Sequence, residues 1–128
     1  MKTVADYAVL SDGNRILETG DSWRTPFFER PEDFVTGTNL ARAILSFNMG
    51  ALSDPPFAPS VDLTITHEGT QNREVFRSVF FNGTGPFTIQ ETFPATDFPS
   101  VVNTRFRFDV QRGRVVISDI VLWYQLRI

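Results

Sequence analysis

The residues best suited to bind a ligand lie near the C-terminus, where Trp123, Gln125 and Arg127 alternate with Tyr124 and Leu126. Successive side chains of a strand point to opposite faces, so the first three share one face. An indole ring can stack on the apolar face of a pyranose, while amide and guanidinium groups bond its hydroxyls or a carboxylate. If the alternate residues face the core, the pattern predicts a sugar-binding surface.

Three further residues extend the list of candidate ligand contacts. Arg105 and Arg107 alternate with phenylalanines, so both point outward, and they lie near Trp123 if their strand neighbours the closing strand. Trp23 lies in an early proline-containing segment, where a rim aromatic can form a second binding patch. The alternative is burial of both tryptophans, Trp123 under a loop or a neighbouring subunit and Trp23 in the core, because tryptophan is mostly buried in folded proteins.

Residues that could catalyse a reaction are few. The absence of cysteine excludes disulfides, thiolate nucleophiles and Cys-ligated metals. His67 is the only histidine, which excludes multi-histidine sites, and at a strand end we expect it to be solvated. No Gly-x-Ser-x-Gly motif is present, which leaves paired carboxylates such as Glu91 and Asp109 as the one enzymatic route. Some close acid pairs arise by chance among 15 acids, so we expect a protein that is not an enzyme.

The charge of the chain limits its partners. A net charge of −3 gives no general attraction to nucleic acid or an anionic membrane. Of the 12 basic residues 11 are arginine, which suits planar, bidentate contacts, although codon usage in a GC-rich genome is the simpler explanation of the bias. No apolar run approaches the roughly 20 residues that span a bilayer, and Asp6 interrupts any signal peptide. The default expectation is therefore a cytoplasmic protein.

Period-two alternation runs through almost the whole chain, and turn residues separate the alternating segments. This predicts an all-β protein with one domain over residues 1–128, an antiparallel two-sheet sandwich of jelly-roll type with eight to ten strands. We expect hairpins at 12–14, 68–72, 82–86 and 111–113, a crossover between sheets at 54–59, and short helical turns at 30–34 and 94–98.

The closing strand changes the parity of its apolar residues. Val115 and Ile117 are apolar at odd positions, whereas Ile120 and Leu122 are apolar at even ones. A strand can change parity only by taking up an extra residue, so the sequence predicts a β-bulge near Ser118–Asp119. The alternative is two separate strands joined by a turn there.

The stretch Arg105-Phe106-Arg107-Phe108-Asp109-Val110, the Gly113 turn and the strand from Val115 to Leu122 resemble the C-terminal part of galactose-binding-like jelly rolls, a group that includes many carbohydrate-binding modules. The resemblance implies glycan binding. It also implies a structural calcium held by Asp119 with Glu18 or Asp21, without a full motif, and no other cofactor.

Two functions are consistent with these patterns. The first is a non-catalytic, carbohydrate-binding module that uses an exposed aromatic and arginine surface. The second is a self-assembling structural or accessory protein, such as a virion, tail or secretion-associated jelly roll. In the second case the partner is a protein or another copy of the chain, and the outward Arg105, Arg107 and Asp109 pair with carboxylates across the subunit boundary.

Overall fold

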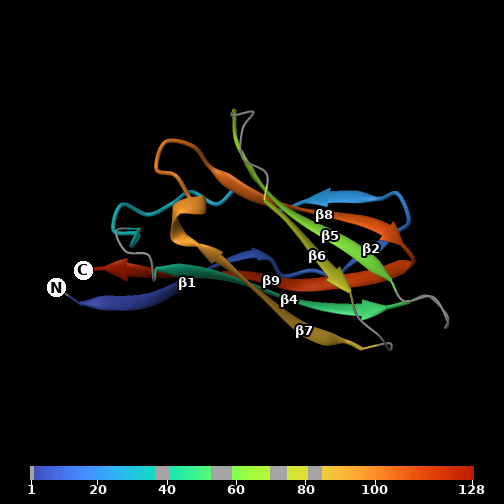
Figure 1. Ribbon diagram of the computed structural model, residues 1–128. Coiled ribbons are helices and arrows are strands. Elements are labelled where there is room, and N and C mark those ends of the chain that lie inside the picture. Colours follow the sequence, from blue (N-terminus) through green and yellow to red (C-terminus); the bar gives the residue numbers. More distant parts are fainter. Residues whose placement is uncertain (1, 37–40, 53–58, 70–74, 81–84) are drawn as a thin grey trace.

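Two antiparallel sheets pack face to face (Figure 1). The computed structural model describes residues 2–36, 41–52, 59–69, 75–80 (backbone only) and 85–128. The five-stranded sheet has the order β1 (Thr3–Ser11), β9 (Arg114–Arg127), β4 (Arg42–Ala51) and β7 (Phe87–Pro94), with β2 (Arg15–Glu18) also paired to β9. The four-stranded sheet has the order β3 (Ser22–Arg24), β8 (Thr104–Arg112), β5 (Ser60–His67) and β6 (Val75–Phe80). The predicted all-β jelly-roll sandwich is confirmed.

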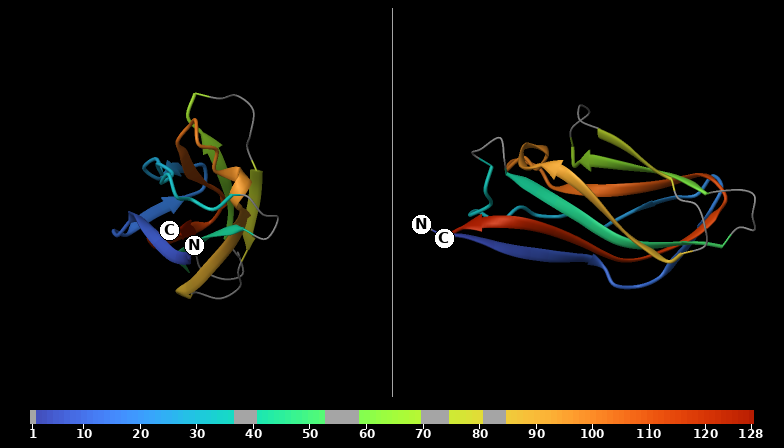
Figure 2. Two further views of the ribbon diagram at one scale, coloured as in Figure 1. Left: turned by 90° about the vertical axis from the view of Figure 1, so that its left-hand side faces the viewer. Right: turned by 60° about the horizontal axis from the view of Figure 1, so that its bottom comes forward.

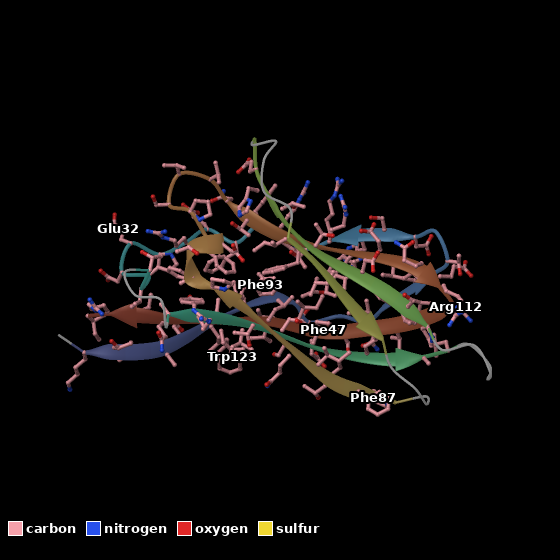
Figure 3. All side chains as sticks on the ribbon, viewed as in Figure 1. Glu32, Phe47, Phe87, Phe93, Arg112 and Trp123 are labelled. Atoms are coloured by element: carbon pink, nitrogen blue, oxygen red, sulfur yellow. The ribbon has the colours of Figure 1, made fainter. Side chains whose placement is uncertain are left out.

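Phenylalanine rings fill the space between the sheets. Phe47 of β4 meets Phe108 of β8 edge-on, with ring centroids 5.1 Å apart. Phe93 of β7 meets Phe106 of β8 at 5.3 Å. All four side chains are at most 1% exposed, and Figure 3 shows Phe47 and Phe93 between the layers. Because each contact joins residues of different sheets, these rings fix how the two layers sit against each other.

The closing strand β9 has the predicted bulge. Its pairing with β4 shifts register between Ser46 and Asn48, and Asp119 has a φ of 55°, in the left-handed region. Before the bulge Ile117 faces the core, and after it Leu122 does, both at most 1% exposed. One extra residue therefore keeps an apolar side chain on the inner face along the whole strand, and it leaves the alternate residues outside.

Three of the predicted hairpins are wrong. Strands β1 and β2 flank the turn at 12–14, but both pair with β9, so the chain bends there and continues along the same neighbour. The turn at 111–113 joins β8 to β9, which lie in different sheets (Figure 2). The loops at 68–72 and 82–86 lie partly outside the described residues. Strands β5 and β6, on either side of 68–72, pair as a hairpin requires, whereas β6 and β7, on either side of 82–86, belong to different sheets.

The other predicted connections agree with the structure. The segment 54–59 lies largely outside the described residues, but β4 before it and β5 after it belong to different sheets, as a crossover requires. A short 3-10 helix, Ala95–Asp97, occupies the predicted turn at 94–98 without a side-chain cap. At 30–34, Phe34 N–H donates to the Pro31 carbonyl at 3.2 Å, as in a single turn.

The expectation that His67 is solvated is wrong. Its side chain is buried, and its Nε2 lies 2.7 Å from the carbonyl oxygen of Asp97, so the ring N–H donates to that oxygen. The 3-10 helix that contains Asp97 covers the end of β5, which a local pattern could not reveal. His67 thus fastens the turn to the four-stranded sheet.

In the described part of the chain, no helix has the length and apolar character needed to cross a membrane.

Candidate binding site

Trp123 lies on the outer face of the five-stranded sheet. Its side chain is 43% exposed, and Figure 3 shows it on the side of the sheet away from Phe47 and Phe93. Tyr7 is its register partner on β1, and the two rings lie 5.1 Å apart at a tilt of 42°. The indole Nε1 donates to Ser46 Oγ at 3.2 Å. The indole is thus held from both sides while much of its surface stays in solvent.

The surface around Trp123, which we call the Trp123 face, has an apolar half and a polar half. On the apolar side, Tyr7 and Val9 of β1 are each 55% exposed. The polar half comes from outward positions of β4 and β7, which the register places opposite one another. Gln125 and Arg127 follow Trp123 on the same face of β9, and both are exposed. The outward polar residues of β4 and β7 are Arg42, Ser46, Asn48, Thr88, Gln90 and Thr92, and the half-buried Ile44 of β4 pairs with Trp123.

The bulge adds a carboxylate to this face. Asn48 Nδ2 donates to Asp119 Oδ2 at 3.0 Å, and Thr88 Oγ1 donates to Asn48 Oδ1 at 2.9 Å. Ser118 Oγ lies 3.4 Å from the same Asp119 oxygen. These bonds fix the direction of each polar group, so the face offers oriented donors and acceptors beside the exposed rings.

The structure separates Arg105 and Arg107 from Trp123. Both lie on β8, in the four-stranded sheet, and point outward on the opposite side of the sandwich. The condition for their proximity, neighbouring strands in one sheet, is therefore not met. Arg107 Nε bonds Asp109 Oδ2 at 2.8 Å, and Asp109 also accepts from Ser22 Oγ at 2.6 Å.

Trp23 belongs to the margin of the core. Its ring is half-buried and stacks on Phe108, with centroids 6.2 Å apart and planes 22° apart. The Arg15 guanidinium carbon lies 4.2 Å from the ring centroid. With a ring and a guanidinium packed against it, Trp23 fits the core interpretation better than a binding patch.

The acids expected to hold calcium lie apart. Glu18 pairs with Arg114, five positions along β9 from Asp119, which corresponds to about 15 Å of strand. Asp21 Oδ2 accepts the Glu18 N–H at 2.9 Å, so Asp21 lies at the Glu18 end. Asp119 cannot share an ion with either acid in this geometry. In the ranges that the structure describes, no three His, Asp or Glu side chains are grouped as a metal site requires.

The carboxylates considered for catalysis also lie apart, since Glu91 belongs to β7 and Asp109 to β8 of the other sheet. An open pocket of about 460 Å³ lies at a loop end, lined by Glu29, Arg30, Glu68 and residues 100–103. Arg30 donates to the Phe98 carbonyl at 2.8 Å, which commits part of its guanidinium to the fold.

The sequence identified Trp123, Gln125 and Arg127 on the Trp123 face but missed Tyr7, Ser46 and the bulge cluster. Both alternating sets of β1 residues mix apolar and polar side chains, so nothing local distinguishes its two faces. The polar residues of β4 look like any solvated strand face until their neighbours are known.

No protein-family model and no curated protein sequence matches the chain. A structure of infectious bursal disease virus, Gx strain, matches with a TM-score of 0.50 and 8% identity, over 99% of this chain and 38% of that one. A family 16 carbohydrate-binding module matches with a TM-score of 0.46 and 17% identity, over 84% and 73%. The family 11 carbohydrate-binding module of Clostridium thermocellum, in complex with a β-1,3-1,4-mixed-linked tetrasaccharide, gives 0.45 and 12%, over 94% and 87%.

At such identities the likeness concerns the fold alone. The protein is a jelly-roll β-sandwich with an exposed aromatic pair on one outer face.

Proposed function

We propose that the protein is a non-catalytic carbohydrate-binding module that holds a glycan on the Trp123 face. The observation that carries the proposal is the exposed ring pair, Tyr7 and Trp123, at 5.1 Å beside a row of oriented polar groups. Apolar side chains scattered singly over a surface need no explanation, but neighbouring exposed rings rimmed by polar residues are typical of binding sites.

The two halves of the face suit the two sides of a sugar. The C–H face of a pyranose packs on the indole of Trp123, and its hydroxyl edge meets the amides and hydroxyls of β4 and β7. Asp119 and Asn48 supply a carboxylate and an amide on the same face. Each of these groups can bond a hydroxyl, and carboxylate bonds are the stronger ones.

The shape of the site favours an extended chain over a single sugar. Along β9, Gln125, Trp123 and Val121 follow at intervals of two residues, about 7 Å each. Asn48 and Asp119 continue the row beyond the register shift. The face is open along the strands, so an internal stretch of a polysaccharide has room to contact the ring pair and the bulge cluster together.

The test is a glycan array followed by titration calorimetry on the best ligand. We expect Trp123→Ala and Tyr7→Ala to lower affinity by about tenfold or more, since each removes a ring that stacks on the sugar. Ile16→Ala is the matched control, because Ile16 is 56% exposed and pairs with Val116 further along β9. It should change affinity less than twofold. An array without a reproducible hit, or equal losses in all three variants, would refute the proposal.

A self-associating protein is the second candidate. The exposed apolar half of the same face, with Tyr7, Val9 and Trp123 adjacent across β1 and β9, could be covered by another copy. Sedimentation distinguishes the two: a dimer that Trp123→Ala converts to monomer supports assembly, whereas a monomer that binds glycan supports the module.

A further inference from the structure

The outer face of the four-stranded sheet carries three neighbouring arginines. Arg24 of β3 is directly opposite Arg107 of β8, and Arg105 lies two residues along β8 on the same face. We call these three residues the arginine cluster. Like charges directly opposite on neighbouring strands destabilise a sheet, so an anion bound beside Arg24 would relieve part of that cost.

Only one arginine of the cluster has a carboxylate partner on the described chain. Arg107 is bound to Asp109 at 2.8 Å. Neither Arg24 nor Arg105 makes an ion pair with any residue that the structure describes. Among the described residues, Arg24 and Arg105 therefore have no carboxylate bound to them, on a chain whose net charge is −3.

Arg105 is held in one orientation. Its guanidinium carbon lies 4.3 Å from the centroid of the Phe27 ring, which is 37% exposed. Its Nε is buried and has no hydrogen-bond partner. The buried Nε is out of reach of a ligand, and stacking on Phe27 fixes the plane in which the other guanidinium N–H groups can meet an acceptor. The residue is thus prepared for a planar or tetrahedral oxyanion.

We propose that the arginine cluster binds an oxyanion, the carboxylate or sulfate group of an acidic glycan, at a second site on the side of the sandwich opposite the Trp123 face. Arginine suits this role because its fork of N–H donors matches the oxygens of both groups. This site is independent of the site proposed for Trp123, and the protein would connect two chemically different glycans.

The borders of the cluster favour a thin polyanion. Asp62 is opposite Asp109 in the next row along the sheet. Beyond Arg105, on the other side, Glu68 pairs with Asn103. The positive band is therefore about two rows deep, or about 7 Å. A slender chain with spaced oxyanions fits between these acids.

The experiment compares three oligosaccharides of equal length, one containing glucuronate, one sulfated and one neutral, by calorimetry on the full chain. We expect saturable binding of at least one acidic oligosaccharide, weakened by added salt. Arg105→Gln should lower its affinity about tenfold or more, because a charge-assisted bond is lost. Arg105→Lys should recover only part of it, since lysine keeps the charge without the planar fork. The comparison of glucuronate and sulfate identifies which oxyanion the site prefers.

Two variants control for folding and for net charge. Arg24→Gln changes an exposed side chain on an edge strand, so it should fold normally and still weaken binding. Arg114→Gln makes the same charge change at an exposed residue of β9 and should leave binding within twofold. Trp123→Ala should also leave acidic binding unchanged, which separates this test from the test of the Trp123 face. The proposal is overturned if no acidic oligosaccharide binds, if Arg114→Gln is as harmful as Arg24→Gln and Arg105→Gln, or if Trp123→Ala alone abolishes binding.

Discussion

The two outer faces of the sandwich expose different kinds of side chain. The Trp123 face exposes two rings whose neighbours are mostly uncharged, and its polar groups are bonded to one another. The opposite face exposes arginines, one of which is bonded to a carboxylate while Arg105 rests on a ring with its Nε unpartnered. One outer face thus exposes aromatic rings with bonded polar groups, and the other exposes arginines. Strand alternation makes this possible, because residues that point away from a shared core can diverge freely.

Phe47→Ala should have the largest effect, because it damages the core that both faces share. Phe47 is 1% exposed and meets Phe108 of the other sheet. We expect a loss of about 3–5 kcal/mol in the free energy of unfolding, measured by denaturant titration. Phe27→Ala, which removes a ring that is 37% exposed, should cost about 1 kcal/mol or less. If the two sheets of Phe47→Ala unfolded in two separate transitions, the two faces would not depend on a common core.

Sequence alternation predicted the position of Trp123 on its face correctly but did not predict that the arginines lie on the opposite one. The parity change between Ile117 and Ile120 predicts both the bulge and the outward direction of Trp123, because a buried strand must keep apolar residues inside. Which face Arg105 lies on depends on whether the two strands joined at Gly113 belong to the same sheet or to different sheets. A tight turn looks the same in both cases, so the separation of the arginines from Trp123 is a property of topology. Burial of His67 likewise depends on a distant helix turn.

Substitutions at Asp119 test whether the bulge sets the Trp123 face. The residue has a φ of 55°, where a β-branched side chain is strained and glycine is not. We expect Asp119→Val to be less stable than Asp119→Gly by about 1–2 kcal/mol in thermal unfolding. Both variants lose the bond from Asn48, so that loss does not contribute to their difference. Equal stability of the two would mean that the left-handed conformation does not hold the register. The arginine cluster should bind its oxyanion normally in both.

The smallest expected effect is the pH dependence of stability caused by Tyr124, a buried residue on the inner side of β9. Burial raises the pKa of Tyr124 above its ordinary value, and the charge and hydrogen bond of Asp6 raise it further. The unfolded chain then loses this proton at a lower pH than the native one, so stability is full below a pH of about 10 and falls as the pH rises beyond it. Asp6→Asn removes the charge, so tyrosinate absorbance should show Tyr124 titrating at a lower pH than in the unmodified protein. A Tyr124 titration unchanged by Asp6→Asn would mean that burial alone sets the shift.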